Sequence, residues 1–220
     1  MPKFVYDLVE KTALQATMQG GYVPKQEIVL MLGTASQQYQ NHLLERAANN
    51  KRTDTALAPF LRRQEYSANP ASANVLPLRD GQFALPVDCA QVDYYDMPGA
   101  DTVVEVDGYA LRNRRVSPLV GPSAQYPVIA TVENGDKQIY PADATRCAVQ
   151  YYAYVPEPTY VETYDTNGNA VYDDAASVDV GWGKQAGPIL IRMTVAALAQ
   201  STKDGQLAAM TEVLKNSDKE

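Results

Sequence analysis

The 220-residue sequence predicts an α+β fold, in which helices at both ends of the chain pack together as one bundle and a β-rich region is inserted between them. Three observations predict this class. Apolar residues recur at helical spacing only near the two ends. Short β-branched and aromatic runs, separated by prolines, fill the middle. Two Asn-Gly pairs lie between such runs, which is typical of hairpins, so we expect an antiparallel sandwich or a barrel-like sheet there.

The N-terminal segment, residues 1–66, is predicted to be helical. Apolar residues three and four apart indicate helices over 3–19 and 24–48, and Pro24 stands where a first-turn proline is favoured. A short third helix follows. Its apolar residues are Leu57, Phe60 and Leu61.

The C-terminal segment, residues 181–220, is predicted to hold two helices that pack on residues 1–66. Pro188 can begin the first, and Asp204 can cap the second. Their apolar positions are Ile189, Ile191, Met193, Val195 and Leu198, followed by Leu207, Met210, Val213 and Leu214.

Residues 67–180 form the predicted β-rich region with long hairpins. Asn134-Gly135 and Asn167-Gly168 mark the two hairpin turns. The candidate strands are Gln82–Val87, Gln91–Tyr95, Thr102–Val106, Val128–Val132, Lys137–Tyr140 and Ala148–Val155.

Charge narrows the possible functions. The chain carries a formal net charge of −7, and residues 67–180 hold 16 acidic and 6 basic side chains. This acidic balance argues against a protein that wraps nucleic acid. No apolar stretch is long enough for a membrane helix, so we expect no membrane segment and synthesis in the cytosol. Cys89 and Cys147 lie in strand-like sequence and are expected to be buried free thiols.

Motifs for catalysis or metal binding are weak. A single histidine, His42, leaves no two-His zinc site, and no nucleophile motif accompanies it. Asp165-Thr-Asn-Gly-Asn169 resembles the start of a calcium loop, but Ala176 occupies the position of the bidentate glutamate, so a plain hairpin tip is the favoured interpretation. Gly183-Lys184 lacks the rest of a phosphate-binding loop. We therefore predict no catalytic, cofactor or metal site, although carboxylate pairs in the acidic middle leave a glycosidase-type enzyme open.

Arginine and tyrosine clusters point towards assembly instead. Arg112, Arg114 and Arg115 are expected in a turn, where they could contact a partner subunit, stay solvated or bind nucleic acid. In a strand, Tyr152 and Tyr154 would share one face and Tyr151 the other, so that one face contacts a neighbour. The predicted subunit-contact residues are Arg112, Arg114, Arg115, Tyr151, Tyr152, Tyr154, Tyr164, Tyr172 and Trp182.

A series of motifs in the C-terminal half carries a family resemblance. It comprises the arginine cluster, Gln125-Tyr-Pro127-Val-Ile, Asn134-Gly135, Gln138-Ile-Tyr140-Pro141, the run from Ala148 to Pro158, the Trp182 loop and the two final helices. Their order resembles that of head-to-tail connector (adaptor, ring or collar) proteins of short-tailed bacteriophages, including crAss-like phages. Residues 1–63 agree with this family in architecture only.

The resemblance implies a structural virion protein of the neck or tail. It implies a ring, commonly of twelve copies, that joins the portal protein to other tail proteins while DNA passes through the channel without being read. The helical bundle would dock on the portal or an adjacent ring, and the β region would contact neighbouring copies. Clustered tyrosines and acids are also compatible with a carbohydrate- or surface-binding phage tail module, which is the alternative.

Overall fold

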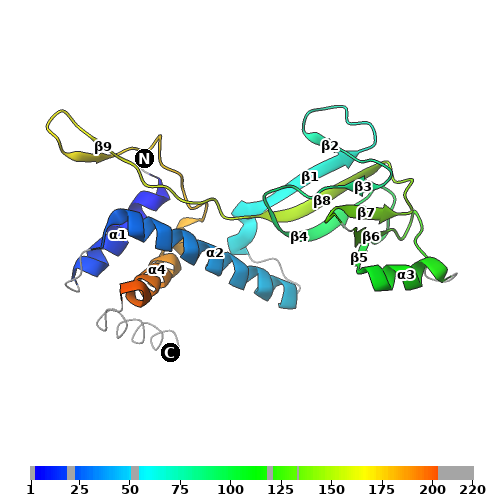
Figure 1. The fold of residues 1–220 in the computed structure, drawn as a ribbon, viewed down its shortest axis with the longest axis horizontal. Coiled ribbons are helices and arrows are strands. Elements are labelled where there is room, and N and C mark those ends of the chain that lie inside the picture. Colours follow the sequence, from blue (N-terminus) through cyan, green and yellow to red (C-terminus); the bar gives the residue numbers. More distant parts are fainter. Residues whose placement is uncertain (1–2, 19–22, 51–54, 118–120, 133, 203–220) are drawn as a thin grey trace. The chain divides into compact units, whose positions relative to one another are not determined.

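The computed structural model describes residues 3–18, 23–50, 55–117, 121–132 and 134–202. The expected final helix at Asp204–Lys215 lies outside these residues. Figure 1 shows the elements in chain order. They are α1 (Phe4–Met18), α2 (Lys25–Asn50), η1 (Thr55–Phe60), β1 (Leu61–Ser67), β2 (Val75–Pro77), β3 (Gln82–Phe83), β4 (Cys89–Asp96), β5 (Val104–Val106), α3 (Gly108–Val116), β6 (Val128–Thr131), β7 (Lys137–Tyr140), β8 (Arg146–Ala153), β9 (Glu162–Tyr164), β10 (Ala170–Tyr172), η2 (Lys184–Ala186) and α4 (Gly187–Thr202).

The chain divides into two compact units. Met1–Phe60 and Val155–Glu220 form the first, here called the helical unit, and Leu61–Tyr154 forms the second, here called the β unit. The hairpin β9–β10 therefore belongs to the helical unit, together with α1, α2 and α4.

The helical unit confirms the predicted packing of N-terminal helices on a C-terminal one, since α4 contacts both α1 and α2. The apolar positions of the three helices account for this. Their most buried members are Val5, Leu8 and Val9 on α1, Ile28, Leu32 and Ala35 on α2, and Leu190, Val195 and Leu198 on α4. Gly187 allows α4 to begin close to α1, because a Cβ at this position would lie 2.9 Å from the Phe4 ring.

The β unit contains two four-stranded sheets, ordered β2-β1-β8-β4 and β3-β7-β6-β5. They share one core, to which both sheets contribute. Its buried members are Tyr66, Leu78, Phe83, Ile129, Ile139, Cys147, Val149, Tyr151 and Ala153. The pairs β1–β2 and β5–β6 are parallel and the other pairs are antiparallel, so the sheets are mixed rather than wholly antiparallel.

Both predicted hairpin turns are present. Asn134-Gly135 joins β6 to β7, and Asn167-Gly168 joins β9 to β10. Each glycine has a positive φ, +87° at Gly135 and +79° at Gly168, which glycine adopts at low cost.

The expected third helix is wrong beyond Phe60. A 3₁₀ helix, Thr55–Phe60, buries Leu57 and Phe60, and the chain then continues as strand β1. All seven residues of β1 pair with β8 in an antiparallel register. The paired residues lie 79 to 91 positions apart in the sequence, and local periodicity cannot reveal such a partner.

The arginine cluster lies on a helix, not in the expected turn. Asp107 caps α3, and its side-chain oxygen accepts a hydrogen bond from the backbone N–H of Ala110 at 2.7 Å. The aspartate before a short run of helix-forming residues was an available signal for this helix.

Candidate interaction surfaces

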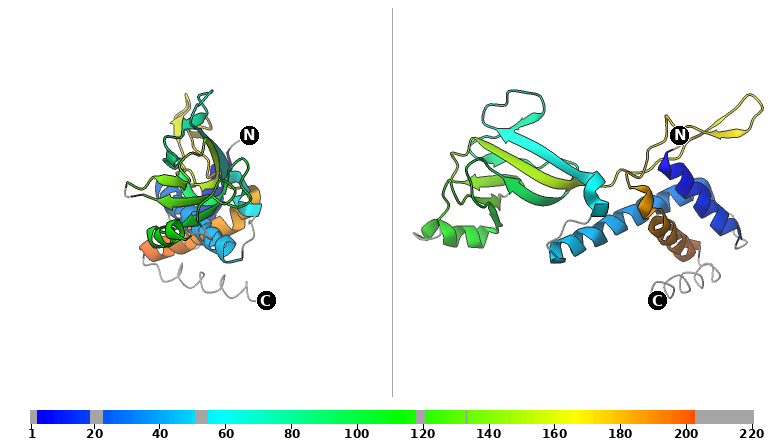
Figure 2. Two further views of the ribbon diagram at one scale, coloured as in Figure 1. Left: turned by 90° about the vertical axis from the view of Figure 1, so that its right-hand side faces the viewer. Right: turned by 180° about the vertical axis from the view of Figure 1, so that it is seen from behind.

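The hairpin β9–β10 extends away from the three helices of its unit, as two views show (Figures 1 and 2). An ionic cluster around Lys25 of α2 fixes its base. The Lys25 ammonium lies 2.7 Å from a carboxylate oxygen of Glu10 on α1 and 2.7 Å from one of Glu162 on β9. It also donates to the Tyr160 hydroxyl at 3.2 Å, and that hydroxyl donates to Glu10 at 2.8 Å. One lysine thus joins two helices to the hairpin.

The electrostatics of this cluster favour its charged form. Burial alone would lower the pKa of Lys25, but its hydrogen bonds to Glu10 and Glu162 outweigh burial and raise that pKa. Burial likewise opposes ionisation of Glu10, yet hydrogen bonds from Lys25 and Tyr160 prevail, so the pKa of Glu10 is lowered. The side chains of Lys25 and Glu10 are about one-third exposed, so solvent screens the attraction.

Aromatic packing strengthens the same base. The ring of Tyr172 on β10 lies 4.9 Å from that of Tyr6 on α1 and 5.1 Å from that of Tyr160. Tyr172, a predicted subunit-contact residue, is therefore half-buried within its own unit. Asp179 completes the attachment, since its carboxylate accepts the backbone N–H groups of Phe4 and Val5 at the start of α1.

The outer part of the hairpin is exposed. Tyr164 on β9 has 77% of its surface exposed, and Val171 on β10 has 48%. At the tip, Asp165 accepts hydrogen bonds from the backbone N–H groups of Asn167 and Asn169, both at 2.8 Å. Hydrogen bonds from Asn169 and Asn167 lower the pKa of Asp165. This carboxylate therefore serves to close the turn, as the hairpin-tip interpretation expects.

Trp182, the single tryptophan of the chain, is buried at 5% exposure. Its ring lies 4.8 Å from that of Tyr39 and 4.6 Å from that of Phe60. Gly181 beside it has a φ of +73°, and a Cβ there would come within 3.1 Å of the Phe60 ring. In the folded chain Trp182 is a packing residue of the helical unit, not an exposed contact.

The three tyrosines near the end of β8 differ in exposure. Tyr151 and Tyr152 are both buried, at 5% and 2%, whereas Tyr154 follows the strand and is 56% exposed. The Tyr151 hydroxyl donates to Asp88 at 3.1 Å. We expected one face of this strand to be buried and the other open, but residues on both faces of β8 are buried. Of these three tyrosines, only Tyr154 is available to a partner.

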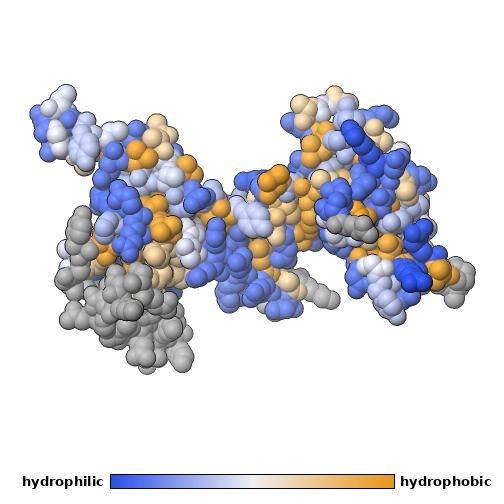
Figure 3. Space-filling view, in the orientation of Figure 1, coloured by the Kyte–Doolittle hydropathy of each residue, from blue (hydrophilic) through white to orange (hydrophobic). Residues whose placement is uncertain are grey.

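Helix α3 presents the arginines at the surface. Arg112 and Arg115 are exposed and Arg114 is half-buried, and none of the residues of α3 is buried. The Arg115 guanidinium lies over the Tyr140 ring, 5.3 Å from its centre. Tyr109 and Val116, which the sequence analysis did not single out, are each 78% exposed on the same helix. Figure 3 shows a largely hydrophilic surface here, with a small apolar area at its end.

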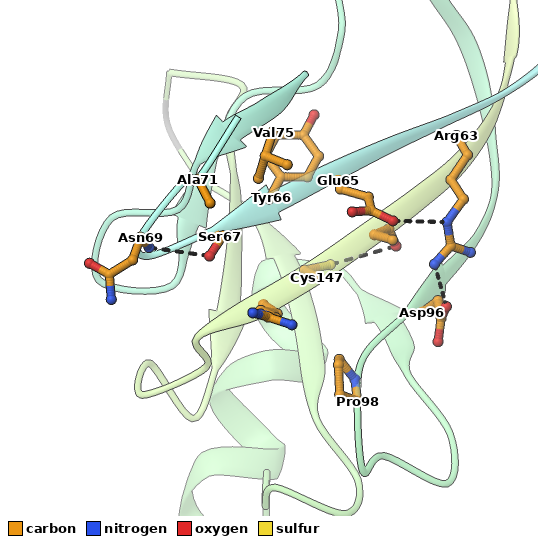
Figure 4. A pocket seen from close by; sticks show the side chains of 12 residues that line it. Arg63, Glu65, Tyr66, Ser67, Asn69, Ala71, Val75, Asp96, Pro98 and Cys147 are labelled. Atoms are coloured by element: carbon orange, nitrogen blue, oxygen red, sulfur yellow. Dashed lines mark hydrogen bonds and ion pairs between the residues drawn. The ribbon is translucent and has the colours of Figure 1, made fainter. Parts of the chain in front are cut away.

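A groove of about 270 Å³ lies on the sheet β2-β1-β8-β4 (Figure 4). Arg63 lines it and pairs with Asp96 at 2.8 Å and with Glu65 at 3.7 Å. Arg146 and Ala148 of β8 line it as well. The lining contains two arginines, Arg63 and Arg146, and two acids, Glu65 and Asp96, so its formal charges balance.

The described part of the chain contains neither a cluster of metal ligands nor a helix suited to cross a membrane. No group of three or more His, Cys, Asp or Glu residues there could hold a metal ion. None of the described helices is long and apolar enough to cross a bilayer. His42 is exposed on α2, and Cys147 is buried while Cys89 is half-buried, both as free thiols. Burial raises the pKa of Cys147 to about 12.

Comparison with known proteins does not identify a relative, since no protein-family model and no curated protein matches the chain.

Proposed function

We propose that this protein is a structural virion component, an adaptor-ring subunit that joins the portal to the tail of a short-tailed bacteriophage and lines part of the DNA channel. Two features support the proposal. The order of motifs in the C-terminal half resembles that of phage connector proteins. The fold, with N- and C-terminal helices packed together and mixed sheets inserted between them, is the architecture that this resemblance implies.

The hairpin β9–β10 is the observation that carries the proposal. Its base is fixed by Lys25, Tyr160 and Tyr172, while Tyr164 beyond the base is 77% exposed. A firmly attached ribbon with an open aromatic side chain suits a permanent protein contact, because little conformational entropy is lost when it binds. Tyrosine is also enriched in protein–protein interfaces.

Charge is compatible with passage of DNA. The segment 155–180 contains six acidic residues and no lysine or arginine. A surface of this kind offers no phosphate-neutralising contacts, so DNA can slide past it. The proposed role needs no catalysis, cofactor or metal.

The groove on the β unit gives little support to the alternative carbohydrate-binding role. Tyr66 is the one aromatic residue among those that line it, and its side chain is only 2% exposed. Sugar rings usually need an accessible aromatic face, and the lining of this groove does not provide one.

The direct test mixes the purified protein with portal rings encoded in the same genome. We expect a complex that sediments as one species and shows an added ring by negative-stain microscopy. Tyr164→Ser should weaken it, whereas Tyr126→Ser, a change at another exposed tyrosine, should not. A protein that never binds portal rings, or that binds glycans on an array as an isolated monomer, would contradict the adaptor role.

A further inference from the structure

Helix α3 is unusual among the helices of the described structure because none of its residues is buried, although Ala110, Leu111 and Arg114 are half-buried. Tyr109, near its start, and Val116, at its end, are each 78% exposed, so the helix leaves a small apolar area in water at each end. Neither Arg112 nor Arg114 forms an ion pair among the residues that the structure describes. The helix thus offers both apolar area and unneutralised positive charge.

The composition of this surface favours a protein partner over nucleic acid. Tyrosine and arginine are the residues most enriched where protein interfaces gain their binding energy. A nucleic-acid surface would extend the positive charge over neighbouring elements. Here the flanking residues Asp101, Glu105 and Asp107 are acidic. The basic area is therefore confined to α3, and it would complement an acidic surface of similar size on a partner protein.

The chain itself contains such a surface in the hairpin β9–β10. Residues 162–174 include four acidic residues, Glu162, Asp165, Asp173 and Asp174, and no basic one. The exposed side chains of Tyr164 and Val171 supply apolar area beside those charges. Of these four carboxylates, only that of Glu162, at the base, pairs with Lys25. The hairpin therefore complements α3 in sign of charge and in its mixture of charged and apolar groups.

We propose that α3 of one copy binds the hairpin β9–β10 of a second copy, in a head-to-tail contact. This inference rests on the proposed adaptor ring and names the two surfaces that build it. A contact between two different surfaces of the same chain repeats from copy to copy and closes into a ring when the rotation permits. Because the contact pairs arginines with carboxylates near the rim of the interface, its affinity falls as salt is added.

The experiment reverses the charge of each surface at exposed positions. Variant A carries Arg112→Glu and Arg115→Glu on α3. Variant B carries three substitutions near the hairpin tip, Thr166→Lys, Asn167→Lys and Ala170→Lys, all at exposed positions that leave the turn-closing Asp165 in place. They change the formal charge of the outer hairpin, residues 163–171, from −1 to +2, whereas Asp173 and Asp174 at its base are kept. Variant AB combines all five changes in one chain. Sedimentation at low ionic strength measures self-association, and thermal unfolding checks that each variant folds.

The wild-type protein is expected to self-associate, and variants A and B should each do so at least about tenfold more weakly. Variant AB should recover association, since the reversed hairpin again opposes a reversed helix. An equimolar mixture of A and B should recover it as well, because each copy of one variant then meets complementary surfaces on the other. Alternation of this kind closes a ring with an even number of copies.

Arg79→Glu provides the matched control, as it reverses an exposed arginine of the same unit outside α3 and should leave association unchanged. The proposed contact is overturned if the wild-type protein stays monomeric, if A and B associate like the wild type, or if neither AB nor the mixture recovers association. Loss of DNA binding by A with unchanged association would overturn it in favour of nucleic acid. Portal binding separates the two proposals, because a chain that binds portal but ignores these substitutions keeps the adaptor role and loses only this contact.

Discussion

The helical unit and the β unit each contain packed and exposed aromatic residues, such as the exposed Tyr164 of the helical unit, but the packed ones serve different purposes. In the helical unit, Trp182 is packed between Tyr39 and Phe60, and the tyrosines near Lys25 attach a hairpin to helices. In the β unit, Tyr66 and Tyr152 are buried at 2%, whereas Tyr109 is 78% exposed. The difference teaches that the abundance of tyrosine in this chain does not itself mark an interface. Only exposure in the folded chain separates packing tyrosines from those that can bind a partner.

The largest effect should follow from removing α4. Cutting the chain after Trp182 removes Leu190, Val195 and Leu198, which are at most 2% exposed. Each buried aliphatic side chain contributes about 1.5–3 kcal/mol, so the helical unit should unfold. Circular dichroism should show loss of helix while the β signal of Leu61–Tyr154 persists. An unchanged thermal transition would contradict the packing of α4 on α1 and α2.

Trp182→Ala should be the most damaging single substitution in the helical unit. Emptying the space between Tyr39 and Phe60 should cost about 3–5 kcal/mol of unfolding free energy. Trp182→Phe is the matched control and should cost less, because it retains an aromatic ring. Chemical denaturation followed by far-ultraviolet circular dichroism measures both. Equal stability of the alanine variant and the wild type would show that this packing is dispensable.

Ile139→Ala tests the β unit separately. Ile139 is fully buried between the two sheets, and its truncation should cost about 2–5 kcal/mol. The thiol of Cys147, 2% exposed in the same core, should then react faster with a thiol reagent in a Cys89→Ser background. At a denaturant concentration that unfolds the β unit of this variant, the fluorescence of Trp182 in the helical unit should not change. A simultaneous change in both probes would mean that the two units unfold as one.

The smallest effect concerns Lys25, whose ion pairs are partly exposed. Lys25→Met should destabilise the protein by up to about 1 kcal/mol near pH 7. The pKa of Glu10 is lowered from its ordinary value of 4.5, so this stabilisation is present above that pH and is lost as the pH falls through the lower folded value. The difference between wild type and variant should therefore shrink in acid. If the difference in unfolding free energy between wild type and variant stays constant down to pH 2, the attachment does not depend on charge. Lys11→Met, at an exposed lysine of α1, serves as the control.

The helices and the hairpin turns were accessible to sequence reasoning, whereas the candidate surfaces were only partly so. The burial of Leu8, Ile28 and Leu198 follows from spacing along one helix, and Asn167-Gly168 is a local turn signal. The arginines of α3 were correctly singled out as a cluster but were assigned to a turn. Lys25 was not singled out, because its partners Glu10 and Glu162 lie at distant positions and no local pattern links them.

The sequence by itself determined that helices lie near both ends of the chain and strands between them, the positions of the two hairpin turns, and the concentration of acidic residues in the middle. These properties depend on residues close together in the chain, where periodicity, capping and turn preferences act. The tertiary structure alone decided that Leu61–Ser67 is a strand, that Trp182, Tyr151 and Tyr152 are buried, and that Tyr109 and Tyr164 are exposed. The reason is physical: burial and strand pairing are set by partners far away in the sequence, which become neighbours only when the chain folds.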